Sequence, residues 1–405
     1  MEQPRALRLL QNDAFVTPLN VFATHLNAPC SSILLAQEDL YSRIYLVVGK
    51  ITGETVFFPV DRAECVSKFE SESKEPITAT TAGDVRNTGK VEVVTVSCNG
   101  HLQSLRFPHP TAQTATPIPT RVFSQQVNAN VCAAECFDID GDGLNEFLVV
   151  MTDRVVRSYR FDQMADCLVP QNKWEMPNQI SGWALGLGSG GPDIGYGLPD
   201  TGLVHYGTVP GQGIPFAGLA QTPNASALNA GLSLPMRLGQ ENWALLSQAC
   251  QSQYVRLDFG QSKNVRVVQS TVADRKYGTL LFIPPNPYAI RLMQSLVSKL
   301  VMVTSEKEVE LHNPGGDFVC VTHARLHSGL HTIITVDPWG QLLVYAFTKD
   351  SQVVDPVARC NVLRDVDHMC AFPGPSNYSL FLSLVNIYNK VAIYLIDLAH
   401  IIQII

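Results

Sequence analysis

The amino-acid sequence predicts an all-β fold that is built from one repeated antiparallel unit. Short runs of β-branched and aromatic residues alternate with Gly, Asn and Asp turns along almost the whole chain, which is typical of short strands joined by tight turns. Similar pairs of runs recur mostly about every 45–55 residues, the period of a four-stranded blade. Because a chain of 405 residues holds seven such units, we predict a seven-bladed β-propeller.

Each predicted blade contains two apolar strands separated by a small polar turn, for which Asn99-Gly100 and Trp339-Gly340 are suitable dipeptides. In chain order, the strand pairs are IYLVVGKITGETVFFPV (44–60), VEVVTVSCNGHLQSLRF (91–107), EFLVVMTDRVVRSYRF (146–161), DTGLVHYGTVP (200–210), KLVMVTSEKEVELH (299–312), TIITVDPWGQLLVYAF (332–347) and SLFLSLVNIYNKVAIYLID (379–397). We therefore expect one domain, 1–405, with blades at about 12–60, 78–109, 130–162, 178–210, 264–312, 319–348 and 364–398.

Three segments depart from this pattern. Residues 289–300, AIRLMQSLVSKL, have the apolar spacing of a helix. Residues 209–262 begin with a stretch rich in Gly, Ala, Asn and Pro, which predicts a loop inserted between blades four and five. Such a loop is either a partner-binding arm or a tolerated insertion. The apolar stretch 394–405 either closes the ring as a last strand or adds a strand or helix to a partner.

Composition narrows the class of partner. Charged residues make up 16% of the chain against a typical value of roughly 25%, which favours a subunit covered by other proteins, although a large buried core gives the same low fraction. A net charge of −7 without a Lys/Arg cluster argues against nucleic acid and anionic membranes as main partners. The ten cysteines lack zinc or disulfide spacing, so we expect reduced, buried thiols. Because no secretory signal or long apolar window is evident, we expect a cytoplasmic protein without membrane insertion.

The acidic stretch CFDIDGDGLNEFLVV at 136–150 is a candidate calcium loop. Its oxygen ligands at loop positions 1, 3, 5, 7 and 9 would be Asp138, Asp140, Asp142, the carbonyl of Leu144 and Glu146. An EF-hand is excluded because position 12 is Val149 and the flanking residues are strand-like. The alternative is a sharp turn whose Asp side chains accept hydrogen bonds from backbone amides.

This loop resembles the FG-GAP repeat of integrin-alpha propellers, which carries Asp- and Gly-rich loops before an apolar strand. An ordered set of stretches is similar to the integrin-alpha FG-GAP-repeat-containing protein 2 family. The stretches are AECFDIDGDGLNEFLVVMTDRVVRSYRF (134–161), AGDVRNTGKVEVVTVSCNGHLQSLRF (82–107), KWEMPNQI (173–180) and, more weakly, 339–347 and 362–398. The resemblance implies that the repeats of the predicted propeller are degenerate FG-GAP repeats.

The family resemblance implies a function as well as a fold. Members are subunits of KICSTOR, a scaffold that brings the GATOR inhibitor of Rag GTPases to the lysosome. The chain is accordingly expected to be a non-catalytic adaptor that binds other scaffold subunits and GATOR. Its expected location is peripheral, on the lysosomal membrane, where it would restrain target-of-rapamycin signalling when amino acids are scarce.

The chain also departs from the integrin pattern. In the preceding loop, 84–92, position 3 is Arg86, whose guanidinium would occupy or repel a cation site, so we expect no calcium in the second blade. The corresponding stretch 324–334 has no acid at all. We therefore expect at most one calcium ion, in the loop that begins at Asp138.

Two other classes of protein remain as alternatives. One is a calcium-binding FG-GAP adhesion propeller, and the other is an enzyme with a site at the central channel. GLGSGG at 186–191 fits a dinucleotide motif, but Pro192 and later glycines prevent the helix that such a site requires. His323, His327 and His331 are predicted to be turn residues rather than metal ligands. We predict no catalytic residues and no organic cofactor.

Overall fold

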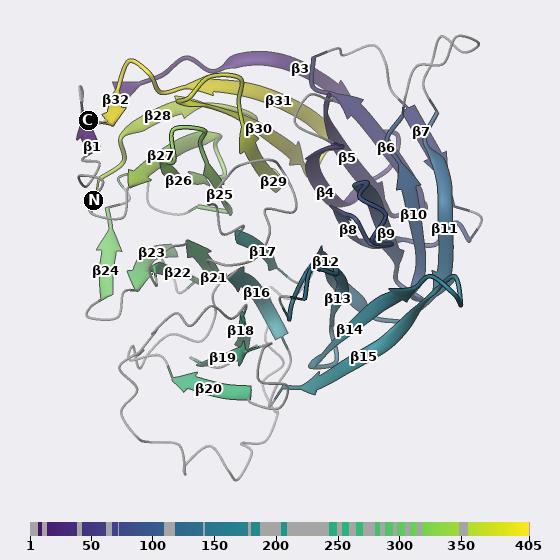
Figure 1. Ribbon diagram of the computed structural model, residues 1–405. Helices are drawn as coiled ribbons and strands as arrows, with labels where there is room; N and C mark the ends of the chain where they lie inside the picture. The colour runs from purple at the N-terminus through teal and green to yellow at the C-terminus, as the bar shows by residue number, and fades with distance from the viewer. Residues whose placement is uncertain are drawn as a thin grey trace. The chain divides into compact units, whose positions relative to one another are not determined.

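The computed structural model contains 32 strands, and no helix is found among the residues that it describes (Figure 1). The described residues are 7–9, 14–38, 43–61, 67–71, 73–108, 118–140, 142–176, 180–186, 204–208, 243–248, 253–258, 265–269, 280–283, 288–294, 298–303, 308–312, 314, 318–347 and 355–404. The all-β class predicted from the sequence is confirmed. Across those residues, no helix has the length and apolar character needed to span a membrane.

The helical spacing of 289–300 is misleading. This stretch forms strands β22 (Tyr288–Gln294) and β23 (Ser298–Val303), which pair in antiparallel fashion. Pairing with a neighbouring strand has outweighed the local apolar spacing, because helix propensity is a weak preference that tertiary structure overrides.

The chain divides into two compact units, the first formed by residues 1–80, 105–122 and 311–405 and the second by 81–104 and 123–310. Within the first unit, one sheet consists of β4 (Cys30–Gln37), β5 (Ile44–Lys50), β6 (Glu54–Pro59) and β7 (Ser67–Glu70) in sequence order. A second consists of β25 (Cys320–Arg325), β26 (His331–Val336), β27 (Gln341–Phe347) and β28 (Ala358–Asn361), with β2 (Ala14–Phe15) added in parallel beside β28.

The third sheet of this unit combines distant parts of the chain. It contains β29 (Val366–Pro373), β30 (Ser379–Asn386) and β31 (Lys390–Asp397), and its fourth strand is β3 (Leu19–His25), which lies along β31 in Figure 1. The stretch after β31 forms β32 (Ile402–Ile404), which pairs with β1 (Leu7–Leu9). The apolar stretch 394–405 is thus paired within the chain itself, through β32.

The second unit contains the sheet that carries the acidic loop. Its strands are β12 (Val131–Phe137), β13 (Glu146–Met151), β14 (Val155–Asp162) and β15 (Cys167–Glu175). A five-stranded sheet follows, with the order β17 (Val204–Thr208), β16 (Ile180–Gly186), β18 (Trp243–Gln248), β19 (Gln253–Asp258) and β20 (Val265–Gln269).

Two more four-stranded sheets complete the set. One is β8 (Ile77–Gly83), β9 (Glu92–Ser97), β10 (His101–Arg106) and β11 (Thr120–Gln126), and the other is β21 (Leu280–Ile283), β22, β23 and β24 (Glu308–Leu311). Among the described strands, seven sheets therefore contain four or five strands each.

The structure corrects part of the predicted insertion. Residues 243–248 and 253–258 are strands β18 and β19, which continue the sheet begun by β16. The predicted loop was extended too far beyond its Gly- and Pro-rich start, because WALLSQ and QYVRLD are ordinary strand sequences. Residues 209–242 and 187–203, which include most of GLGSGG, lie outside the described residues.

Burial differs systematically between the strands of one sheet. Second strands such as β5, β9, β13 and β26 are buried along nearly their whole length, whereas fourth strands such as β7, β11 and β15 alternate or are largely exposed. Strands covered on both faces are continuous apolar runs, and an edge strand keeps polar residues on its open side. The alternation of apolar and polar strands in each sequence repeat follows from this difference in burial.

One backbone hydrogen bond recurs in five of the sheets. The turn between the second and third strands ends in a residue with positive φ, and its carbonyl accepts a hydrogen bond from the first residue after the fourth strand. The acceptors are Gly53, Gly100, Arg154, Gly340 and Asn389, and the donors, in the same order, are the amides of Ser71, Val127, Met176, Val362 and Leu26, at 2.8–3.2 Å. The repeat inferred from the sequence is thus also a repeat of backbone geometry.

Gly100 and Gly340 show why this turn limits the sequence. Their φ values are +84° and +86°, a region that side chains disfavour. A Cβ on Gly340 would also lie 2.6 Å from the carbonyl oxygen of Val362, the residue that donates to it. The glycine therefore allows both the turn and its close contact with the exit of the sheet.

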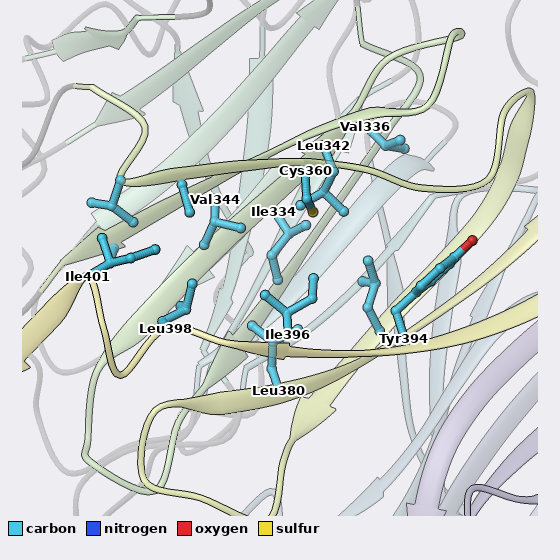
Figure 2. Close-up of a cluster of buried hydrophobic side chains, with 14 of the residues drawn as sticks. Ile334, Val336, Leu342, Val344, Cys360, Leu380, Tyr394, Ile396, Leu398 and Ile401 are labelled. Carbon is cyan, nitrogen blue, oxygen red and sulfur yellow. The ribbon is translucent and has the colours of Figure 1, made fainter. Parts of the chain in front are cut away.

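Apolar side chains fill the space between neighbouring sheets of the first unit. Figure 2 shows Ile334, Val336, Leu342 and Val344 of the β25–β28 sheet together with side chains from β30, β31 and the segment after β31. A second cluster joins the β29–β31 sheet to β5 and β6. These contacts between whole faces replace the single core of a two-layer domain.

Truncating a side chain in this core should destabilise the protein strongly. Ile396 is fully buried, so Ile396→Ala is expected to lower the free energy of unfolding by about 2–5 kcal/mol through lost transfer energy and a cavity. Ile387→Ala is the matched control, because Ile387 is 60% exposed and a surface change usually stays within about 0.5 kcal/mol. Urea unfolding of both variants measures the difference; equal effects would contradict this packing.

Candidate functional site

The acidic loop joins β12 to β13, and two of its acids are buried. Asp138 follows directly after β12 and Glu146 is the first residue of β13; they are 7% and 1% exposed. Asp140 and Asp142 lie in the exposed part of the turn, as does Leu144. The carboxylate oxygens of Asp138, Asp140 and Glu146 come within 4.8 Å of one another.

Asp138 holds the turn through backbone amides. Its Oδ1 accepts a hydrogen bond from the amide of Asp142 (3.2 Å) and its Oδ2 one from Gly143 (2.7 Å), which has a φ of +89°. Asp142 Oδ1 accepts from the amide of Leu144 at 2.9 Å. Glu146 Oε2 accepts from the amide of Ile139 at 2.9 Å. The side chains thus bond the backbone as the turn hypothesis predicts.

Arg160 brings a positive charge into the same cluster. It lies on β14 directly opposite Glu146 in the antiparallel register. Its Nε donates to Glu146 Oε1 at 2.5 Å, and its Nη2 contacts the same oxygen. Its Nη1 donates to Asp142 Oδ2 at 2.7 Å and its Nη2 to Asp140 Oδ2 at 3.1 Å. One guanidinium therefore bonds three of the four acids.

The arrangement does not fit a calcium ion. Calcium takes six to eight oxygens at about 2.3–2.6 Å. Both oxygens of Asp138 and of Glu146 already accept hydrogen bonds from amides or from Arg160, and Arg160 engages Asp140 and Asp142 as well. A divalent ion at this point would lie against the guanidinium, and the two like charges would repel each other.

Burial and hydrogen bonding together shift the pKa values of these acids in different directions. Burial raises the pKa of the Glu146 carboxyl to about 7, against the opposing hydrogen bonds from Ile139 and Arg160. Burial also raises the pKa of Asp140, although Arg160 opposes it. For Asp142 the hydrogen bonds from Leu144 and Arg160 outweigh burial and lower the pKa. Glu146 is therefore the acid whose pKa lies near neutrality.

The preceding loop, 84–92, repeats this construction. Asp84 accepts hydrogen bonds from the amides of Thr88 (2.8 Å) and Gly89 (2.5 Å), as Asp138 does in its own loop. Glu92 is 1% exposed and is paired with Arg86, whose Nε lies 3.1 Å from Oε1. Ser104 also donates to Glu92. The predicted role of Arg86 as a guanidinium within the loop agrees with this geometry.

Two asparagines join the loops to each other. The amide of Asn145 donates to Asn87 Oδ1 at 2.6 Å, and Asn87 Nδ2 donates back to the Asn145 carbonyl at 3.1 Å. The Asn145 side chain also donates to the Asp84 carbonyl at 3.1 Å, and Gln163 donates to the Arg86 carbonyl. The two loops thus form one continuous polar network.

Sequence reasoning missed Arg160, Asn87 and Asn145. Asn87 has a φ of +55°, which Asn tolerates better than most residues, but nothing in the sequence indicates its partner in the next loop. Arg160 could have been found by counting the register outward from the turn at Thr152, because that register places it opposite Glu146.

Three histidines and the cysteines are the other chemistry-bearing groups that the sequence singled out. His323 and His331 lie on the paired strands β25 and β26, so the prediction that they are turn residues is wrong, whereas His327 lies in the turn between these strands. The cysteines that the structure describes are free, and burial raises the pKa of the Cys30, Cys132 and Cys320 thiols to about 12. Because the thiolate is the reactive form, these thiols are poor nucleophiles at neutral pH.

The fold class agrees with solved structures over nearly the whole chain. A chain of the crystal structure of BBS1N in complex with ARL6DN has a TM-score of 0.58 at 9% identity, and the match covers 95% of this chain and 99% of that one. The Cps50 (Swd1) β-propeller domain of Myceliophteria thermophila has a TM-score of 0.52 at 8% identity, over 93% and 99% of the two chains. The β-propeller class is confirmed, and the number of blades stays a prediction.

A sequence model of the family described as integrin-alpha FG-GAP repeat-containing protein 2 matches residues 63–204, which include both loops. The protein named KICSTOR complex protein ITFG2 from Mus musculus is 33% identical over 172 residues, or 37% of this chain and 36% of the relative. Its Bos taurus counterpart is 31% identical over 166 residues, or 37% and 30%. The resemblance found in the sequence is confirmed, and the chain spans about a third of the length of these relatives.

The raised pKa of Glu146 predicts a specific dependence of stability on pH. Its folded-state pKa of about 7 lies above its ordinary value of 4.5, so its contribution is fully present below pH 4.5 and is lost as the pH rises through 7. Wild type should therefore lose stability relative to Glu146→Gln between these values, as measured by thermal melting at a series of pH values. The opposite slope would show that pairing with Arg160 outweighs burial.

The network between the loops should show coupling. Asn87→Ala and Asn145→Ala each remove hydrogen bonds to the neighbouring loop, so each is expected to cost about 1–3 kcal/mol of stability. Asn87→Ala removes two bonds to the backbone of Asn145, which Asn145→Ala keeps, whereas Asn145→Ala removes the bond to the Asp84 carbonyl. Because both sets of bonds join the same two loops, the double variant should cost less than the sum of the single variants. A double-mutant cycle by urea unfolding measures this, and strict additivity would show that the two sets of bonds act independently.

Proposed function

We propose that the chain is a non-catalytic scaffold subunit of a KICSTOR-like complex. The observation that carries this proposal is the match of residues 63–204 to the FG-GAP repeat-containing protein 2 family, together with relatives named as KICSTOR complex proteins. The matched part contains the two loops and the Asn87–Asn145 contact, so the similarity lies in an organised part of the structure.

The finer function follows the family resemblance. In this proposal the chain binds the other scaffold subunits, and the complex brings the GATOR inhibitor of Rag GTPases to the lysosome. The chain is then cytoplasmic and peripheral on the lysosomal membrane, held there through its partners. It restrains target-of-rapamycin signalling when amino acids are scarce.

Surface chemistry supports a binding role. Charged residues make up 16% of the chain, and low surface charge suits a subunit that covers its exterior with other proteins. A chain of similar fold comes from the crystal structure of BBS1N in complex with ARL6DN, so a chain of this fold occurs in a protein complex. The acid cluster could favour a calcium-binding adhesion propeller, but Arg160 already pairs with its carboxylates.

Exposed apolar side chains at two turns of the first unit offer a contact surface for a protein subunit. Trp339, Ile387 and Tyr388 are 60–66% exposed. Their turns are connected through Asp365, whose amide donates to the Pro338 carbonyl and whose carbonyl accepts from Ile387. Exposed aromatic residues on a rigid turn are typical anchors of protein interfaces.

Affinity purification tests this function. The tagged full chain, purified from fed and from amino-acid-starved cells, should co-purify the other KICSTOR subunits and GATOR, identified by mass spectrometry. Trp339→Ala with Tyr388→Ala should reduce recovery of the scaffold subunits. Met164→Ala, which removes a 96% exposed side chain elsewhere, should leave recovery unchanged. Absence of both scaffold and GATOR subunits from the wild-type sample would refute the proposal.

A further inference from the structure

We propose that Arg160 is the resident cation of the acidic loop 138–146 and that it takes the place of a calcium ion. The loop has the residue types and spacing of a calcium loop, and three of its carboxylates converge. The positive charge that pairs with Asp140, Asp142 and Glu146 comes from the protein itself, through Arg160. The loop is therefore closed without a metal.

The geometry of the guanidinium carries this proposal. Arg160 bonds Asp140, Asp142 and Glu146 with different nitrogens, at distances that include 3.1, 2.7 and 2.5 Å. A planar guanidinium has five N–H donors in a fixed fork and can satisfy several carboxylates at once. The Arg160 side chain is 23% exposed; its pair with the buried Glu146 is shielded from water, whereas Asp140 and Asp142 are 49% and 42% exposed.

Register explains why Arg160 reaches the cluster. Glu146 and Arg160 face each other on β13 and β14, so the register of this hairpin places the guanidinium beside the last acid of the loop. A calcium ion would have to displace these contacts and remain beside the cation that it displaced. Because Glu146 is 1% exposed, it also needs a permanent donor.

The neighbouring loop supplies an independent second case. Glu92 and Glu146 occupy the same loop position and are equally buried, and each is bonded by an arginine. Arg86 comes from within its loop, whereas Arg160 comes from the opposite strand. Two arginines at unrelated sequence positions thus perform the same task, which points to a requirement of the buried glutamate.

The first measurement compares calcium binding by wild type and by Arg160→Gln, using isothermal titration calorimetry on the full chain. Wild type should give no binding heat up to millimolar calcium, and its melting temperature should not change with calcium or with chelator. Arg160→Gln should gain a site with a Kd of about 10⁻⁴–10⁻³ M, typical of weak calcium modules, and calcium should raise its melting temperature. Arg157→Gln, which alters another arginine of β14, should gain no site.

Two results would overturn the proposal. One is calcium binding by wild type that Asp140→Asn abolishes, because the loop would then hold a metal in spite of Arg160. The other is a folded Arg160→Gln variant that binds no calcium. If Arg160→Gln does not fold, Arg160→Lys decides: it keeps the charge and should fold without calcium, whereas a dependence of its folding on calcium contradicts the proposal.

Discussion

Each acidic loop ends in a glutamate that is buried at the start of the second strand of its sheet, and the other contacts of the loop depend on this residue. Glu92 and Glu146 are each 1% exposed, and a carboxylate in such a place is costly unless donors satisfy it. An arginine meets this need in both sheets, with a serine added at Glu92 and a backbone amide at Glu146. The first Asp of each loop then fixes the turn by accepting hydrogen bonds from two backbone amides.

The two loops, once fixed by these contacts, also connect their two sheets to each other. Once both turns are fixed, Asn87 and Asn145 can bond each other across them. The turn between the second and third strands lies at the other end of each of these two sheets. There the residue after the fourth strand donates a backbone hydrogen bond to the carbonyl of a positive-φ turn residue, which holds this end of the sheet together. Polar bonds at the ends of the sheets, and apolar packing between the sheet faces of the first unit, stabilise repeats whose sequences have diverged.

Much of this fold was predictable because its repeat is local. Alternating strands and glycine turns such as Gly100 and Gly340 follow from short-range pattern, and the structure confirms them. The candidate ligands Asp138, Asp140 and Glu146 were also found from spacing alone, and the structure brings them together.

Long-range pairing could not be predicted in the same way. Pairing of β3 with β31, and of β18 with β16, depends on segments that are distant in sequence and carry no matching motif. The pairing of the acid cluster with an arginine could not be predicted for a similar reason. Its partner Arg160 lies on a different strand, and only the register reveals that it faces Glu146.

A crystal structure of the wild-type protein, grown with millimolar calcium, tests the central claim most directly. Electron density should place the Arg160 guanidinium within hydrogen-bonding distance of Asp140, Asp142 and Glu146, with no ion among them. An ion about 2.3–2.6 Å from these carboxylate oxygens, with Arg160 turned away, would contradict the claim.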